Sequence, residues 1–195
     1  MVRELSDEKR ERFLEVALRL FAEKGVQNTS TAEIAQAAGT ASGTLFLYFP
    51  TKQMLVNELV IHISKGQAER INQLLNPSLS VRDSLYTIWE TSIHWFLDNM
   101  EVFQFTQQIR GSNLIAEETI YETGKLFAFY YSTIQRGLDD GCIKPYPVDL
   151  IGGFLYQDIM AVMNHMRMPL GPLEQEEAIQ QGFDLFWSGI QIQKT

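Results

Sequence analysis

Cysteine and long hydrophobic runs are the scarcest features of this chain, which has 195 residues and a single cysteine, Cys142. One cysteine excludes an internal disulfide and any cysteine-rich zinc site, so a reducing compartment is the simplest interpretation. No stretch approaches the roughly 18 apolar residues that a membrane span needs. The N-terminus, MVRELSDEKRERF, is charged where a signal peptide would be apolar. The sequence therefore predicts a cytoplasmic protein with no membrane partner.

Positive charge is also in short supply, with 16 Lys and Arg against 24 Asp and Glu and a net charge of -8. Such a balance argues against nucleic-acid binding, which depends on neutralising phosphates. The deficit is uneven, however: residues 1–60 contain 7 basic and 8 acidic residues, so almost all of the excess lies further along the chain. A nucleic-acid partner therefore remains compatible with the N-terminal part. The acidic remainder favours a neutral or cationic small molecule over an anion.

Helical periodicity dominates the rest of the sequence. Residues 7–24 place Phe13, Ala17, Leu20 and Phe21 on one face, and Gly25 follows as a C-cap. Similar patterns recur to the end of the chain, and no strand pair or internal repeat is evident. The sequence predicts an all-α protein of about nine helices, with a three-helix module in residues 1–50 and a larger helical domain in residues 51–195.

A short segment near the N-terminus has the arrangement of a helix-turn-helix. Ser30 precedes Glu33 by three residues, which is a capping box, and the helix that follows ends at Gly39. A second short helix, ASGTLFLYF, is stopped by Pro50, after which Thr51 can cap a long helix over residues 52–75. Two short helices joined by a tight turn are typical of DNA-binding modules.

The segment NTSTAEIAQAAGTASGTLFLYFPTKQML resembles the DNA-binding motif of the TetR/AcrR family of transcriptional regulators. The match covers about the first 55 residues, and the remainder agrees with the family in length and helical content. The matching positions are Thr29, Ile34, Ala35, Ala38, Gly39, Gly43, Thr44, Leu45, Phe46, Tyr48, Phe49 and Lys52. The resemblance implies a homodimer that binds a palindromic operator in double-stranded DNA and responds to a small-molecule effector, often an apolar one.

The predicted recognition helix departs from the family pattern because it has no charged residue between Gly39 and Phe49. Hydroxyl groups can still reach base edges or phosphates, and Leu47 can meet a thymine methyl group. Tyr48 and Lys52 are expected to contact the DNA backbone, whereas Leu45 and Phe49 are expected in the core of the module. The predicted DNA-binding residues are Thr29, Ser30, Thr40, Ser42, Gly43, Thr44, Phe46, Leu47, Tyr48 and Lys52.

Large side chains at helical spacing fill the C-terminal part. Most are expected in the core, while some helices are aromatic on more than one face, which suits the wall of an effector cavity. The predicted cavity residues are Trp89, His94, Phe103, Gln107, Phe127, Tyr130, Tyr131 and Gln157. The last two helices resemble the dimerising pair of the family, with an interface predicted at Phe154, Met160, Met163, Phe183, Phe186, Trp187 and Ile190.

The hypothesis is therefore a ligand-responsive transcriptional regulator, in particular a repressor that its effector releases from DNA. One alternative is a helical ligand-binding or interaction protein whose N-terminal module has weak or lost DNA binding, and the uncharged recognition helix keeps it open. A helical enzyme is a further rival, but no Ser/His/Asp set, metal-ligand cluster or phosphate loop is evident. No cofactor and no metal are predicted.

Overall fold

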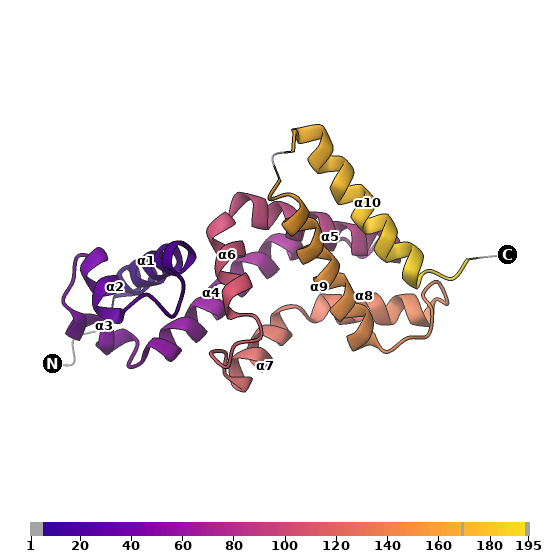
Figure 1. Ribbon diagram of the computed structural model, residues 1–195. Coiled ribbons are helices and arrows are strands. Elements are labelled where there is room, and N and C mark those ends of the chain that lie inside the picture. The colour runs from indigo at the N-terminus through magenta and orange to yellow at the C-terminus, as the bar shows by residue number, and fades with distance from the viewer. Residues whose placement is uncertain (1–5, 169, 194–195) are drawn as a thin grey trace. The chain divides into compact units, whose positions relative to one another are not determined.

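Ten α-helices account for most of the computed structural model, which describes residues 6–168 and 170–193 (Figure 1). An isolated antiparallel bridge between Ile143 and Gln191 is the remaining regular feature of the described residues. None of their helices is both long enough and apolar enough to span a bilayer. The helices are α1 Asp7–Lys24, α2 Thr31–Ala37, α3 Ser42–Tyr48, α4 Lys52–Leu74, α5 Val81–Asp98, α6 Met100–Ile109, α7 Glu117–Leu126, α8 Ala128–Asp139, α9 Val148–His165 and α10 Pro172–Ile190.

The all-α prediction is confirmed, and the helix count differs because one predicted helix is two. The chain breaks at Phe127, whose φ and ψ are -102° and 21°, between α7 and α8. The amide of Phe127 donates to the carbonyl of Gly124, and the amide of Tyr130 donates to that of Phe127. These hydrogen bonds, each to the carbonyl three residues earlier, tighten the backbone as in a 3₁₀-helix. The rings of Phe127, Phe129 and Tyr130 lie together here, with centroids 5.1–5.8 Å apart.

Contacts divide the chain into two units, each with its own core. Unit 1 contains the residues up to Lys65 together with Asn99–Thr123, and unit 2 contains Gly66–Asp98 and the residues from Gly124 on. Unit 1 therefore holds α1–α3, the first part of α4, α6 and most of α7. The functional boundary that the sequence places at residue 50 stays a prediction.

The core of unit 1 joins the helix-turn-helix to α1, α4 and α6. Leu45 and Phe49 are fully buried, as predicted, and the ring of Phe13 meets that of Phe49 edge-on at 6.4 Å. Burying each such side chain contributes about 1.5–3 kcal/mol, which is enough to hold two seven-residue helices that would not be stable alone. The positions of α2 and α3 therefore depend on the neighbouring long helices.

Helix α6 packs against α1 within unit 1. The rings of Phe21 and Phe105 stack with centroids 5.9 Å apart. Beside them, Gln108 accepts a hydrogen bond from the amide of Val26 at 3.0 Å and donates to the carbonyl of Phe21 at 2.9 Å. Because the helix end at Gly25 leaves backbone groups without helical partners, the Gln108 side chain completes the C-terminus of α1.

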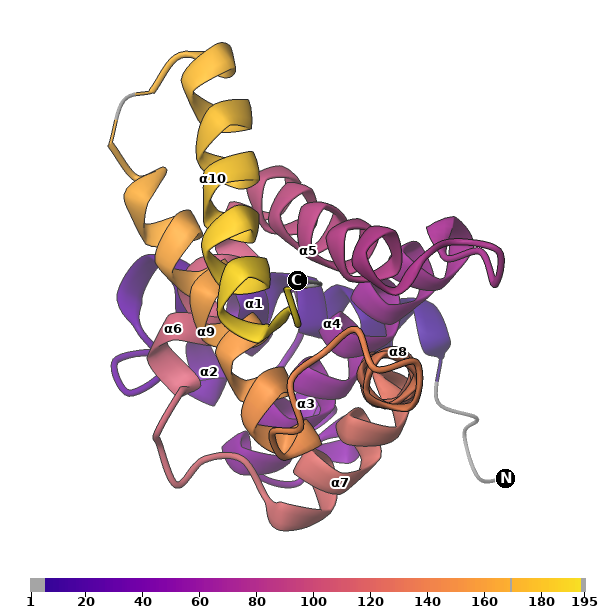
Figure 2. The same ribbon diagram turned by 90° about the vertical axis from the view of Figure 1, so that its right-hand side faces the viewer.

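Unit 2 is a bundle of α5, α8, α9 and α10 with the end of α4 (Figure 2). Trp89 of α5 is fully buried, donates from Nε1 to the carbonyl of Ile179 at 2.9 Å, and stacks on Phe186. Gly182 permits this close packing, since a Cβ there would lie 2.5 Å from Val162 and 2.8 Å from Trp89. A side chain at residue 182 would therefore push α10 away from α5 and α9.

Candidate DNA-binding site and dimer face

A glycine in the turn and two hydroxyl caps, all indicated by the sequence, hold the helix-turn-helix in place. Gly39 has φ +71° in the turn between α2 and α3, a conformation that L-residues rarely adopt. At the start of α2, the Ser30 hydroxyl accepts a hydrogen bond from the amide of Glu33 at 3.1 Å. The Thr51 hydroxyl caps α4 in the same way by accepting from the amide of Met54.

The capping box at Ser30 is only half formed. The Glu33 carboxylate pairs with Lys24 of α1, and this contact lowers the pKa of Glu33 and raises that of Lys24. Glu33 therefore ties α2 to α1 in addition to its place in the first turn of α2. Sequence spacing could not distinguish these two partners, because it does not show which helix lies alongside.

One face of α3 is buried and the other is open. Leu45 lies in the core, whereas Gly43, Phe46 and Leu47 are exposed and Ser42 and Thr44 are half-buried. The side chain of Leu47 is 68% exposed and takes no part in the core. The fold does not use this outer face, so it is free to contact another molecule.

A shallow depression of about 420 Å³ lies beside this face and collects residues from three elements. Lys52 comes from the first turn of α4, Phe46 from α3, and Ser30 and Thr31 from the start of α2. Burial lowers the pKa of Lys52, and α4 begins at this residue. A cation is disfavoured at a helix N-terminus, but an anion bound there would contact both the ammonium group and the backbone amides.

Tyr48 makes one contact through its ring and another through its hydroxyl group. Its ring packs edge-on against Phe13 at 5.4 Å, and its hydroxyl accepts a hydrogen bond from the amide of Ser6 at 3.0 Å. Accepting this bond does not use the hydroxyl's own hydrogen, so Tyr48 can still donate to a phosphate. The same bond holds the residue that precedes α1 close to the exit of α3.

Two predicted DNA contacts need correction because their hydroxyls are engaged inside unit 1. Thr29 is only 1% exposed, and its hydroxyl lies 2.9 Å from the carbonyl of Gly25 and 3.3 Å from that of Leu20. The Thr40 hydroxyl donates to the carbonyl of Ala35 at 3.3 Å. Thr29 therefore fastens the chain after α1, and Thr40 fastens the turn, so neither is placed to donate to DNA.

Gly43 offers a direct test of this surface. It lies in the first turn of α3, and a Cβ there would meet no atom within 4 Å. We expect Gly43→Ala to raise the free energy of unfolding by about 0.5–1 kcal/mol, because alanine loses less backbone entropy in a helix. We also expect it to weaken DNA binding, since a methyl group would stand on the approach surface. Chemical denaturation and fluorescence anisotropy with duplex DNA measure the two effects, and unchanged DNA affinity would remove Gly43 from the site.

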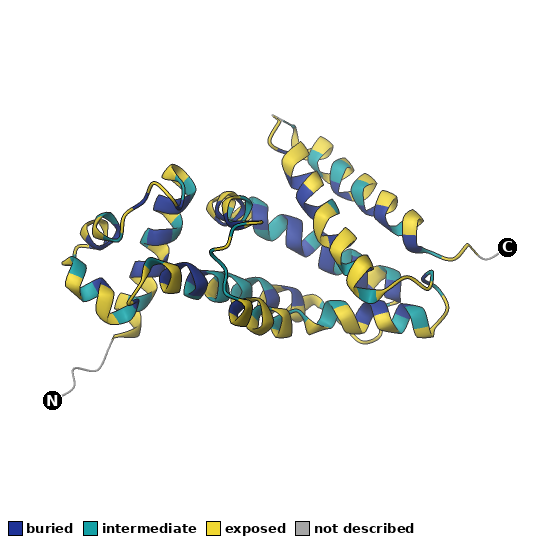
Figure 3. Cartoon of the chain, turned by 60° about the horizontal axis from the view of Figure 1, so that its bottom comes forward, coloured by how far each residue is buried: buried dark blue, intermediate teal, exposed yellow. Residues whose placement is uncertain are grey.

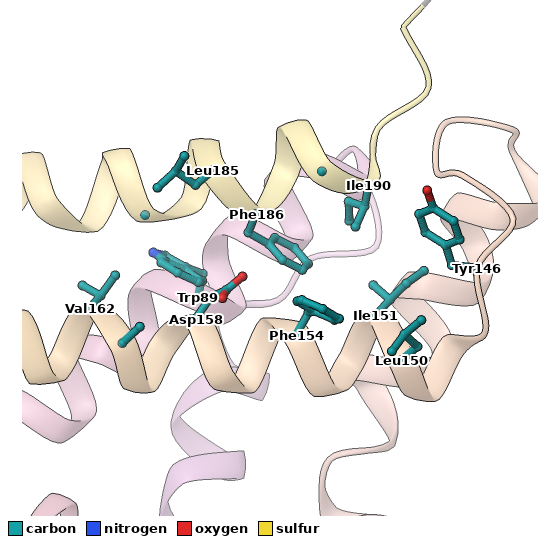
Figure 4. Close-up of a pocket in the computed structure, with 13 residues that line it drawn as sticks. Trp89, Tyr146, Leu150, Ile151, Phe154, Asp158, Val162, Leu185, Phe186 and Ile190 are labelled. Carbon is teal, nitrogen blue, oxygen red and sulfur yellow. The ribbon is translucent and has the colours of Figure 1, made fainter.

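Helices α9 and α10 of unit 2 enclose an apolar groove of about 550 Å³ (Figure 4). Phe154 and Leu150 of α9 and Leu185 of α10 lie along it and are 57%, 50% and 76% exposed. The floor includes Trp89 and Phe186, which belong to the core. Asp158 is the acidic residue in the lining, and burial raises the pKa of its carboxyl group.

The predicted dimer interface overlaps this groove in part, and it stays a prediction. Met160, Met163 and Phe183 are buried within a single chain, whereas Phe186 and Ile190, which are also largely buried, line the groove. Trp187 is half-buried, with its ring parallel to that of Phe183. Phe154 alone points outward as expected, and the exposed apolar residues that accompany it were missed. Figure 3 shows the division of these helices into buried and exposed faces.

The predicted effector residues are divided between the two units. Phe103 and Gln107 belong to α6 of unit 1, whereas the other six belong to unit 2. Trp89 is core, His94 faces Glu176 of α10, and Tyr131 and Gln157 are exposed. Among these residues, Phe127 and Tyr130 have their rings in contact.

Tyr130 also has a polar neighbour, Ser92, that sequence spacing did not indicate. Its hydroxyl lies 3.2 Å from that of Ser92 on α5, and burial raises the pKa of Tyr130 to about 12. Tyr130 therefore stays protonated, so a hydroxyl pair is held among aromatic rings. Ser92 sits on the inner face of its helix, where a serine is inconspicuous among apolar neighbours.

Comparisons with known proteins agree with this architecture. Residues 13–59 match the family model described as bacterial regulatory proteins, tetR family. The HTH-type transcriptional repressor KstR2 of Mycolicibacterium smegmatis is 25% identical over 186 residues, which cover 93% of this chain and 90% of KstR2. The regulator AcrR of Shigella flexneri is 44% identical over 54 residues, 28% of this chain and 25% of AcrR.

Similarity to solved structures extends over both units. The crystal structure of a putative tetR family transcription regulator from Shewanella sp. PV-4 has a TM-score of 0.87 and 25% identity, covering 95% of this chain and 99% of that one. The matched helix-turn-helix, the all-helical architecture and the full-length similarity point to the same conclusion. Residues 13–59 are a DNA-binding domain of the bacterial tetR family, and the chain as a whole is similar to transcriptional regulators of that family.

Proposed function

We propose that the protein is a homodimeric repressor that binds a palindromic operator through α3 and leaves it when a small molecule binds to unit 2. The observation that carries the DNA-binding part is the outer face of α3. It exposes Phe46 and Leu47, with Phe46 lining the same depression as Lys52, while the inner face supplies the core. The match of residues 13–59 to the tetR family model supports the proposal, and a protein that binds an operator would act in the cytoplasm.

Sequence recognition on this surface would depend on hydroxyl and apolar contacts. Ser42 and Thr44 would face base edges, and Leu47 would contact thymine methyl groups. Backbone contacts would come from Ser30, Tyr48 and Lys52. An uncharged α3 cannot make the arginine-guanine contact, so we expect the shape of the DNA to contribute to specificity.

The exposed groove on α9 and α10 would be covered by a second copy of the chain. Leu150, Phe154 and Leu185 would then pack against the equivalent helices of the partner in an isologous interface. Monomeric proteins rarely expose such a continuous apolar surface. A dimer would hold two recognition helices roughly 34–36 Å apart, which is one turn of DNA.

The effector is proposed to be apolar and either neutral or cationic, as the acidic charge of this part favours. Phe127 and Tyr130 would contact its apolar body, and the hydroxyl pair of Ser92 and Tyr130 would accept or donate one hydrogen bond. Helix α4 contributes residues to both units, so its displacement would change the separation of the recognition helices. A coupling of about 1–3 kcal/mol would lower operator affinity 5- to 150-fold.

A second candidate function is an interaction protein that has lost DNA binding. The observation that favours it is the absence of charge on α3, where the exposed residues are Gly43, Phe46 and Leu47. In that case the apolar face of α3 would contact another protein. Replacing Lys52 distinguishes the two functions, since only DNA binding depends on a phosphate contact.

We expect Lys52→Ala to weaken binding to duplex DNA about 10-fold at low salt. Removing one phosphate contact should also reduce the slope of log affinity against log salt by about 1, whatever the base sequence. Titrations of labelled duplex at several salt concentrations measure both effects. Lys65→Ala is the matched control, because Lys65 is exposed on the same helix outside the depression. Equal affinity and slope for Lys52→Ala and wild type would favour the second function.

A further inference from the structure

The contact between α5 and α10 in unit 2 contains a group of side chains that the regulator function does not use. The two helices run antiparallel, as three cross-contacts show. Arg82 pairs with Asp184 at 3.2 Å, Trp89 bonds the carbonyl of Ile179, and His94 Nε2 lies 3.8 Å from Glu176 Oε1. Glu90 completes the group at the end occupied by His94.

Three of these side chains converge on one point. The ligand atoms of Glu90, His94 and Glu176, one from each residue, all lie within 4.8 Å of one another. Glu90 and His94 are four residues apart on α5, so they share a helix face, and Glu176 approaches from the first part of α10. All three are at least partly exposed, so small rotations can shorten the separations to those of a coordination shell.

We propose that Glu90, His94 and Glu176 bind a Zn²⁺ ion that ties the beginning of α10 to α5. One imidazole and two carboxylates are suitable zinc ligands, at distances of about 2.0–2.2 Å, and water would take the fourth tetrahedral position. The imidazole argues against Mg²⁺ and Ca²⁺, which prefer oxygen ligands alone. The charges of the two carboxylates balance that of the ion.

Tyr86 acts as an outer partner of the group. Its hydroxyl donates to Glu90 Oε1 at 3.2 Å, which orients the carboxylate from the side away from His94 along α5. Among the described residues, Glu176 forms its ion pair with His94. The cation Arg82, which also lies between α5 and α10, pairs with Asp184 instead.

The metal site would act on the helix that carries the proposed dimer face. Glu176 lies in the first turns of α10, and Leu185 follows on the same helix. A bound ion would limit the fraying of this end and stabilise unit 2. The inference does not depend on DNA binding, and it holds or fails whether or not the protein is a repressor. Sequence patterns do not indicate the group, because Glu176 is distant from His94 along the chain.

Zinc titration of the untagged, chelator-treated chain tests the proposal by calorimetry. We expect saturable binding of one Zn²⁺ per chain, no saturable binding of Mg²⁺ under the same conditions, and a rise in Tm of about 5 °C with zinc in large excess. His94→Gln should abolish both the binding and the rise in Tm, whereas Tyr86→Phe should weaken binding about 10-fold. Circular dichroism checks that each variant is folded.

Two matched controls separate this site from adventitious binding. His165→Gln removes an exposed histidine of α9, and Glu177→Gln removes the exposed glutamate next to Glu176. Both should bind zinc as wild type does, while Glu176→Gln should lose most of its affinity. Wild-type binding by His94→Gln or Glu176→Gln would overturn the proposal. An equal loss in either control, or no saturable binding to wild type, would overturn it as well.

Discussion

Leu185→Glu is expected to leave the chain folded but monomeric, and to lower its affinity for a palindromic operator at least about 100-fold. Leu185 is 76% exposed in the groove between α9 and α10, so the glutamate meets water in the monomer and an apolar partner surface in the dimer. A buried unpaired carboxylate strongly disfavours association. A monomer contacts only one half-site, so it loses the gain in affinity of about 10²–10⁴-fold that linking two binding modules provides.

Leu173→Glu is the matched control for this variant. Leu173 lies on the same helix and is 81% exposed, but it does not line the groove. We expect it to remain dimeric and to bind DNA as wild type does. Analytical ultracentrifugation gives the oligomeric state, and a Leu185→Glu chain that still sediments as a dimer would place the interface elsewhere.

Leu47→Glu is expected to reduce operator affinity about 100-fold without unfolding unit 1. The side chain is 68% exposed on the outer face of α3, so replacing it leaves the core intact. On DNA, however, a carboxylate there would face phosphates, and opposed like charges cost several kcal/mol. Fluorescence anisotropy with the operator duplex measures the loss.

Ile120→Glu is the matched control for Leu47→Glu, because Ile120 is another exposed apolar residue of unit 1. Both variants carry the same added charge, so a general effect of net charge on DNA affinity would appear in both. We expect Ile120→Glu to retain affinity within a few fold of wild type. A similar loss in the two variants would contradict the assignment of α3 as the recognition helix.

The helix-turn-helix was predictable because its determinants are local. Gly39 in the turn, Leu45 and Phe49 in the core, and Thr51 as a cap all occur where the spacing places them. Thr29 was not predictable in the same way. Its hydroxyl bonds to carbonyls at the end of α1, and a threonine that bonds the backbone cannot be told from one that faces DNA by its place in the motif.

The proposed dimer face could not be predicted from periodicity. Helix α9 is apolar around most of its circumference, so spacing alone does not say which face packs inward. On α10, the regular set of Ile179, Phe183, Phe186 and Ile190 is the buried face, and the outward face is marked chiefly by Leu185. Packing against α5 and α9 determines which face of α10 is buried, and this tertiary packing does not show in the spacing of residues along one helix.

Selection from random duplexes with the purified dimer tests the central claim, that this uncharged α3 reads DNA sequence. The account predicts one enriched palindrome, with half-sites centred about 10 bp apart, which matches the spacing of two recognition helices on one face of DNA. It also predicts that Leu47→Glu enriches no such sequence under the same conditions. Wild-type protein that enriches no sequence over the starting pool would contradict the claim.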